Sequence, residues 1–185
     1  MKKLVSTLLT KDEFWGIISR SDNGKNLSGE LRQLSEDELF GYLYWWHYFS
    51  RQAYKQELWA VAYVVIGYCS DDAFTDFRNW LISRGKLVYM NACEEADRLC
   101  DEFEKLKADD SDYPLQEELA YLPMYTIEEK SNKDFHDAEL EAQEYIEFEE
   151  APFPVITFEW AADDEASIRR VCPKTFDKWW KNEKF

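Results

Sequence analysis

Apolar positions along this chain recur every three or four residues, the spacing that brings side chains onto one face of a helix. The longest run follows Ser35 and Glu38, a pair with the spacing of a helix capping box. It consists of Leu39, Tyr42, Leu43, Trp46, Phe49 and Ala53. A second pair with this spacing, Thr10 and Glu13, precedes an earlier apolar group. Helices are therefore predicted to begin just after Thr10 and just after Ser35.

The middle of the chain carries the strongest signal for a buried helix. Residues 59–66 are almost all apolar, and Gly67 can end that helix because glycine accepts left-handed backbone angles. Residues 69–72 then read as a new helix N-terminus, with a serine cap and acids in the first turn. The predicted core contains Trp59, Val65, Phe74, Phe77 and Leu81.

Later helices are predicted from the same periodicity. Their markers are Lys86, the stripe Leu99, Phe103 and Leu106, the acids Asp163 and Asp164, and Pro173. A helix opening near Pro114 should break or bend at Pro123, because proline lacks the amide donor and crowds the preceding turn. Residues 155–160 form the best candidate strand. They have no evident partner strand, so we expect extended chain laid on the helices.

These patterns predict an all-α fold. We expect one irregular helical bundle over residues 1–185, with at most a minor extended or β segment near the C-terminus. A chain of 185 residues fits a single domain, and 45% of its residues are hydrophobic, which suffices for a packed core. The central helices are expected near residues 36–54, 56–67 and 71–84.

The net charge of the chain bears on its binding partners rather than on its fold. The chain has 38 acidic residues against 22 Lys and Arg, a net charge of −16. Such a field repels nucleic acid and anionic membranes and favours basic partners. Residues 134–150 hold eight acids and no Lys or Arg, so they form either a solvated helix or an acidic connector. The candidate contact residues in this run are Glu141, Glu144, Glu147 and Glu149.

The cysteines and the short apolar runs indicate the compartment. Cysteines stand at 69, 93, 100 and 172 without a C-x-x-C pair or a histidine at zinc spacing, and they are interpreted as reduced thiols. The N-terminal apolar run is too short for a signal peptide. No apolar run approaches the ~20 residues that a membrane span needs. We therefore expect a cytoplasmic protein.

One group of polar residues is concentrated enough to be a candidate site. It consists of Asp71, Asp72, Asp76, Arg78, Trp80 and Arg84. A structural interpretation explains it as a capped helix with its own ion pairs, and this interpretation is favoured. A functional interpretation makes it a ligand pocket at a helix N-terminus. The acids do not match the spacing of a calcium-binding loop, so neither a metal nor a cofactor is predicted.

The sequence shows no recognisable catalytic set, so we favour a protein without enzymatic activity. It lacks a phosphate-binding glycine loop, a nucleophile elbow and a zinc-protease motif. The two histidines, His47 and His136, are not paired in sequence with a cysteine. Aromatic residues at 44–49 and 179–180 lack the basic neighbours that single-stranded nucleic acid requires, and core packing explains most of them.

The central segments resemble a known family. They are Leu58-Trp59-Ala-Val-Ala-Tyr63, Cys69-Ser-Asp-Asp-Ala-Phe74, Phe77-Arg-Asn-Trp80-Leu-Ile-Ser-Arg-Gly85 and Val88-Tyr89. With Phe14-Trp15 near the start and Trp160 and Trp179 near the end, the chain resembles the bacterial family described as domain of unknown function 4240. The acidic run at 134–150 departs from that family's pattern. The resemblance supports the fold prediction and implies no activity.

Two functions of different classes follow from these observations. The preferred one is protein–protein interaction through an acidic surface, with a basic partner such as a toxin or nuclease that the chain neutralises, as immunity proteins do. The alternative is a small-molecule-binding or enzymatic domain that uses the polar block at 70–84. An enzyme should show a pocket converging on Asp71, Asp72, Arg78 and Arg84. A binding protein should show these groups paired with one another and its acids spread over a convex or grooved face. The sequence does not indicate the oligomeric state.

Overall fold

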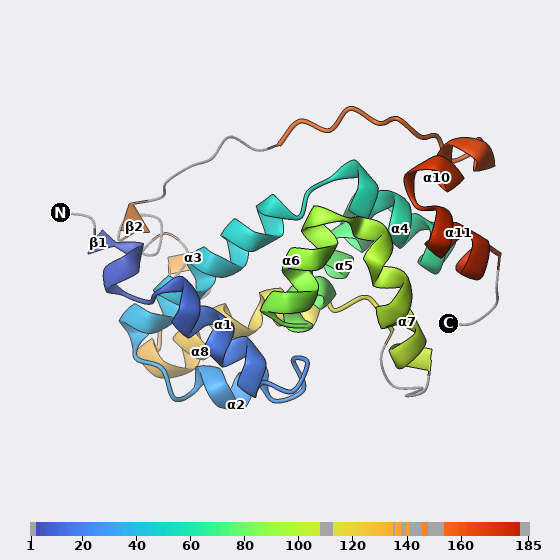
Figure 1. The fold of residues 1–185 in the computed structure, drawn as a ribbon. Helices are drawn as coiled ribbons and strands as arrows, with labels where there is room; N and C mark the ends of the chain where they lie inside the picture. Colours follow the sequence, from blue (N-terminus) through green and yellow to red (C-terminus); the bar gives the residue numbers. More distant parts are fainter. Residues whose placement is uncertain are drawn as a thin grey trace. The chain divides into compact units, whose positions relative to one another are not determined.

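The structure is a computed structural model that describes residues 3–107, 113–134, 136–137, 140, 146–147 and 154–181. Within these residues the fold is all-α, as predicted (Figure 1). The described β-structure is one parallel pair of two-residue strands, β1 (Lys3–Leu4) and β2 (Ile146–Glu147). None of the described helices is both long enough and apolar enough to cross a membrane.

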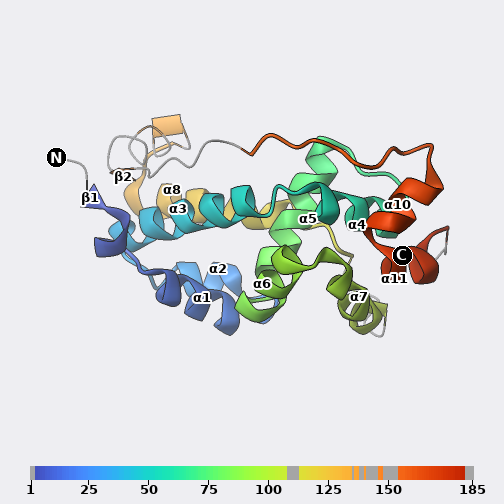
Figure 2. The same cartoon turned by 45° about the horizontal axis from the view of Figure 1, so that its top comes forward.

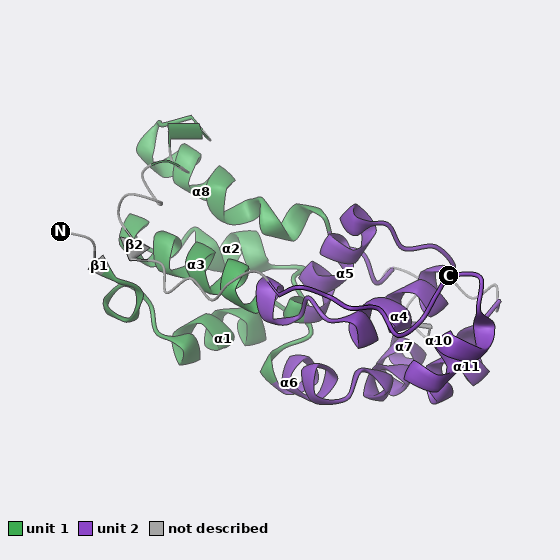
Figure 3. Cartoon of the chain, turned by 90° about the horizontal axis from the view of Figure 1, so that it is seen from above, with its two compact units in different colours: residues 1–49, 82–86, 117–152 green, residues 50–81, 87–116, 153–185 purple. Residues whose placement is uncertain are grey.

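The chain divides into two compact units, each assembled from three separate stretches of sequence (Figure 3). Unit 1 comprises residues 1–49, 82–86 and 117–152, and unit 2 comprises residues 50–81, 87–116 and 153–185. The prediction of a single domain stays a prediction. The two units are described separately below.

Unit 1 is built on helices whose starts are set by local caps. Its elements are η1 (Val5–Thr7), α1 (Lys11–Arg20), α2 (Leu27–Leu31), α3 (Glu36–Gln52) up to residue 49, η3 (Glu118–Ala120) and α8 (Leu122–Ser131). Thr10 and Glu13 form the predicted capping box. Ser35 and Glu38 form the second one, with the Ser35 amide 2.7 Å from the Glu38 carboxylate. Both predicted helix starts are confirmed.

Aromatic side chains of α1 and α3 fill the core of unit 1. Phe14 has no exposed surface, and its ring lies 4.9 Å from that of Tyr42 and 5.3 Å from that of Phe49, measured between centroids. Gly41 allows α3 to approach the segment between η1 and α1 closely, because a Cβ at position 41 would lie 2.6 Å from the Cβ of Leu9. Any larger residue at 41 would push these elements apart.

Unit 2 contains most of the predicted central block. Its elements are α4 (Gln56–Ile66), α5 (Asp71–Ser83) up to residue 81, α6 (Lys86–Glu94) from residue 87, η2 (Ala96–Leu99), α7 (Cys100–Lys107), α10 (Glu165–Val171) and α11 (Pro173–Trp179). Gly67 ends α4 at φ 84°, as its position predicted. Asp164 caps α10, and Pro173 opens α11. The five predicted core residues of this block are all buried.

Residues 154–160 are extended and have no strand partner, as the sequence indicated (Figures 1 and 2). They lie on α4. The Glu159 amide donates to the side chain of Gln56 at 2.6 Å, and the Trp160 indole donates to the Gln56 carbonyl at 3.1 Å. The Trp160 ring also lies 5.5 Å from that of Tyr63. The extended segment is therefore held on the helices by both hydrogen bonds and ring contacts.

One local prediction was wrong. Pro123 does not break a helix; it stands in the first turn of α8, after the short helix η3. A proline is well placed there because the amide it lacks would have no intrahelical acceptor. The residues after Pro114 are not helical until η3 begins at Glu118.

Candidate functional site

The polar block on α5 begins as a capped helix terminus. The Ser70 hydroxyl accepts a hydrogen bond from the Ala73 amide at 3.2 Å. Asp71 and Asp72 follow in the first turn, and both are exposed to solvent. Acids at this position stabilise a helix by facing the positive end of its dipole. These features account for Ser70, Asp71 and Asp72 without a ligand.

Arg78 points inward and is held by the protein itself. Its side chain is 6% exposed. The guanidinium donates to the Ser50 carbonyl at 2.9 Å, to the Phe74 carbonyl at 3.2 Å and to the Thr75 hydroxyl at 2.8 Å. It also lies 5.0 Å from the ring centroid of Tyr54. Burial lowers the pKa of Arg78 from its usual value. The residue therefore joins the end of α3 to α5 rather than facing a ligand.

The remaining residues of the block lie in different surroundings. Trp80 is fully buried, with its ring stacked 5.5 Å from that of Phe103. The backbone carbonyl of Asp76 accepts from the Gln116 amide at 3.1 Å. Arg84, which belongs to unit 1, donates to the Asn23 carbonyl at 2.7 Å. Among the described residues, no group of three or more His, Cys, Asp or Glu is arranged to hold a metal ion.

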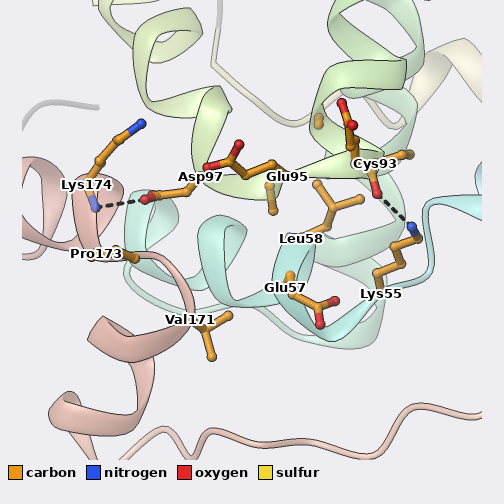
Figure 4. A pocket seen from close by; sticks show the side chains of 12 residues that line it. Lys55, Glu57, Leu58, Cys93, Glu95, Asp97, Val171, Pro173 and Lys174 are labelled. Atoms are coloured by element: carbon orange, nitrogen blue, oxygen red, sulfur yellow. Dashed lines mark hydrogen bonds between the residues drawn. The ribbon is translucent and has the colours of Figure 1, made fainter.

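A pocket of about 440 Å³ lies elsewhere in unit 2 (Figure 4). Its walls come from the start of α4, the end of α6, η2 and the junction of α10 with α11. They include Lys55, Glu57, Leu58, Cys93, Glu95, Asp97, Val171, Pro173 and Lys174. None of the site residues proposed from the sequence lines it. The charges around this pocket are mixed, so they do not select one sign of ligand.

The most buried polar group of this pocket has a structural task. Asp97 is 6% exposed, and its carboxylate accepts from the amides of Lys174 at 2.9 Å and Thr175 at 2.8 Å. It thereby caps the first turn of α11 from a distant part of the chain, as Figure 4 shows for Lys174. Sequence reasoning missed this residue because an acid 77 positions from its helix gives no local signal.

Other polar groups of the pocket, Lys55, Glu94 and Glu95, also have partners within the protein. The Lys55 ammonium donates to the Cys93 carbonyl at 2.6 Å. Arg98 forms ion pairs with Glu94 and Glu95 at 2.9 and 2.8 Å. Burial raises the pKa of the Cys93 thiol, so this sulfur is protonated at neutral pH and is a poor nucleophile. The described pocket therefore shows no activated catalytic group.

The proposed acidic contact residues lie mostly outside the described part of the chain. Glu141, Glu144 and Glu149 are not described, and Glu147 is described only as backbone in β2. Of the same run, Asp134 and Asp137 are described and exposed. The structure instead shows an exposed surface that the sequence did not single out, on η3 and α8. Its tyrosines at 121 and 125 gave a sequence signal no different from core aromatics.

Comparisons with known proteins agree with the resemblance of the central block. The family model described as "Protein of unknown function (DUF4240)" matches residues 9–128. No curated protein and no solved structure matched the chain.

Proposed function

The chain belongs to the DUF4240 family, and we propose that it is a protein-binding domain whose acidic surface holds a basic protein partner. The observation that carries this proposal is the excess of carboxylates. If every Lys and Arg formed an ion pair with a different acid, 16 acids would still lack one. Carboxylates that the chain cannot neutralise itself attract a cationic surface and speed its encounter.

The partner class follows from the sign and size of this charge. The negative field of the chain would attract a basic toxin or nuclease in the cytoplasm and speed its association. The complex would then cover the active surface of that toxin or nuclease. Nucleic acid and anionic membranes carry the wrong charge for this role. Neutralisation of a basic protein is therefore the form of binding that we favour.

The alternative is a ligand site or an enzyme at the polar block of α5. It is supported less well, because Arg78 is engaged with two carbonyls and a hydroxyl. Asp71→Asn separates the two functions. Ser70 still caps the helix and only the charge at 71 is removed, so we expect a loss of about 0.3–1 kcal/mol from the dipole and no change in partner binding. Loss of binding or turnover at unchanged stability would instead favour the α5 site.

The proposal is tested by the rate at which the partner associates. A partner captured from the host is purified, and association is followed by stopped-flow fluorescence at several salt concentrations. Association should slow with salt, because ~0.15 M salt screens exposed charges beyond about 8 Å. Replacing Glu141, Glu144, Glu147 and Glu149 by glutamine should lower the association rate more than it raises the dissociation rate.

A matched variant tests whether the position of the charges matters. It carries the corresponding amides at four exposed acids of unit 2, Asp72, Asp101, Glu159 and Asp163. Both variants lose the same net charge, and we expect the larger slowing from the 141–149 variant. Equal slowing would contradict a special role of the acidic run. The acidic-surface proposal fails if the unmodified chain associates at a rate that does not change with salt. It also fails if the 141–149 variant associates as fast as the unmodified chain at every salt concentration.

A further inference from the structure

We propose that the basic partner docks on one solvent-facing helical surface of unit 1 and that it presents arginine there. This surface, called the α8 face below, consists of Glu117, Glu118, Tyr121, Tyr125, Glu128 and Glu129. The inference rests on the proposed function and adds to it a location and a side-chain chemistry.

Backbone hydrogen bonds join η3 and α8, so the residues of the α8 face lie on one continuous helical surface. Tyr121 N donates to the Glu118 carbonyl at 3.0 Å, and Tyr125 N donates to the Tyr121 carbonyl at 3.0 Å, so the turn of η3 runs into α8. The opposite side of the segment is buried through Leu119, Met124 and Ile127. Steps of three and four residues then bring positions 118, 121, 125 and 129 onto the outer side.

Two neighbouring tyrosines at the centre of this face are both exposed. Tyr121 is 41% exposed and Tyr125 is 54% exposed. Their ring centroids lie 6.2 Å apart with the planes tilted by 33°. A single exposed ring is ordinary, whereas adjacent exposed rings form an apolar patch with hydrogen-bonding tips. Tyrosine is enriched among the residues that dominate binding energy at protein interfaces.

Carboxylates flank the tyrosines at both ends. Glu117 and Glu118 are exposed one turn before Tyr121. The half-buried Glu128 and the exposed Glu129 follow one turn after Tyr125. Glu129 contacts Arg32 at 3.1 Å, but both side chains are 60% exposed. Such an exposed pair contributes little, so a partner can replace Arg32 at small cost. The Lys130 ammonium on the same helix donates to the Leu34 carbonyl, a neutral acceptor outside this face.

Arginine is the side chain that fits this combination of groups. Its planar guanidinium stacks on aromatic rings and also donates two parallel hydrogen bonds to a carboxylate. A lysine ammonium supplies the charge but not the flat surface or the paired donors. The face thus favours a basic protein segment with arginine side chains spaced to reach the tyrosines and the glutamates together.

The test uses a synthetic helical peptide with arginine once per turn and alanine elsewhere, and a second peptide with lysine in place of arginine. Affinity is measured by calorimetry with the full chain, alongside the captured partner. The unmodified chain should prefer the arginine peptide. Removing both rings in Tyr121→Ala/Tyr125→Ala should weaken it about tenfold, because two ring–cation contacts at an exposed site are lost. Tyr121→Phe/Tyr125→Phe keeps the ring faces and should retain most of the affinity.

A matched control removes two exposed tyrosines from unit 2, in Tyr68→Ala/Tyr113→Ala. Circular dichroism checks that each variant is folded. The inference fails if the chain binds its partner and the peptide but Tyr121→Ala/Tyr125→Ala binds them as tightly as Tyr68→Ala/Tyr113→Ala does. The proposed function then stands. If the unmodified chain binds neither, the proposed function fails as well. Dimerisation that Tyr121→Ala/Tyr125→Ala abolishes would identify a second copy of the chain as the occupant and overturn a basic partner.

Discussion

Arg78 is a buried cation held by neutral oxygen atoms. The Ser50 and Phe74 carbonyls and the Thr75 hydroxyl take its donors, and the Tyr54 ring lies against its plane. None of these hydrogen bonds is to a carboxylate, and burial of the charge lowers the pKa of Arg78. Hydrogen bonds to neutral oxygens and the contact with the Tyr54 ring, rather than an ion pair, therefore hold this arginine in place.

We expect Arg78→Lys to lower the free energy of unfolding by about 1.5–3 kcal/mol, because an ammonium cannot reach all three acceptors, which lie on α3 and α5. Urea unfolding monitored by tryptophan fluorescence measures the loss. Partner binding by the folded variant should be unchanged. A stability equal to that of the unmodified chain would mean that the guanidinium bonds are not needed for the fold.

The buried thiols make stability depend on pH in the alkaline range. Burial raises the pKa of Cys172 from 9.0 to about 12, and its side chain is fully buried. The folded state therefore favours the protonated thiol, and this contribution is complete below pH 9.0. It is lost as pH rises toward 12, at up to about 1.4 kcal/mol per pH unit for one thiol.

Cys172→Ala should reduce the slope of stability against pH between 9 and 12, because the variant has no thiol to titrate at this position. Urea unfolding of both chains at a series of pH values gives the two slopes. The cavity cost of the substitution is independent of pH and cancels in the comparison. Parallel curves would show that the Cys172 thiol titrates alike in the folded and unfolded chains.

At the scale of single elements, α5 has the most completely buried apolar stripe of unit 2. Phe77 is 0% exposed, and its ring lies 5.4 Å from Trp80 and 6.4 Å from Phe103. We expect Phe77→Ala to cost about 3–5 kcal/mol, the usual range for emptying a packed aromatic site. Denaturant unfolding checks this value. A loss below ~1 kcal/mol would show that the site collapses around the missing ring.

The helices could be predicted where their signals are local. Thr10 with Glu13, and Ser35 with Glu38, are caps that need no information from elsewhere in the chain, and both form as expected. Gly67 likewise ends α4 through its own backbone conformation. Pro123 was misjudged because its effect depends on where the helix begins, and the preceding short helix η3 sets that point.

The sites were harder to predict because they depend on tertiary contacts. Asp97 caps a helix far away in sequence, and Arg78 reaches a carbonyl on another helix. The exposure of Tyr121 and Tyr125 depends on which side of α8 is covered, and that side is set by tertiary packing rather than by local sequence. The composition predicted a basic partner, but the spacing of residues along the chain did not indicate which surface that partner would bind.

At the scale of the whole chain, neither compact unit is a contiguous segment. Residues 1–81 contain α1 to α4 and most of α5 but lack residues 82–86 and 117–152, which complete unit 1. They therefore lack Leu119, Met124 and Ile127, which are buried in the intact unit. We expect a fragment of residues 1–81 to show helical far-ultraviolet dichroism without the near-ultraviolet signal of packed aromatic rings. A cooperative unfolding transition in this fragment would contradict that expectation.

The interleaving of the two units also has a consequence during synthesis. Many multidomain proteins fold their N-terminal domain while the ribosome is still adding residues at about 5–20 per second. This chain cannot follow that order, because the last segment of unit 1 begins at residue 117 and that of unit 2 at residue 153. The aromatic side chains of α3 and α5 therefore leave the ribosome before the segments that complete their units. The nascent chain should bind hydrophobic-surface chaperones through most of its translation and release them only near its end.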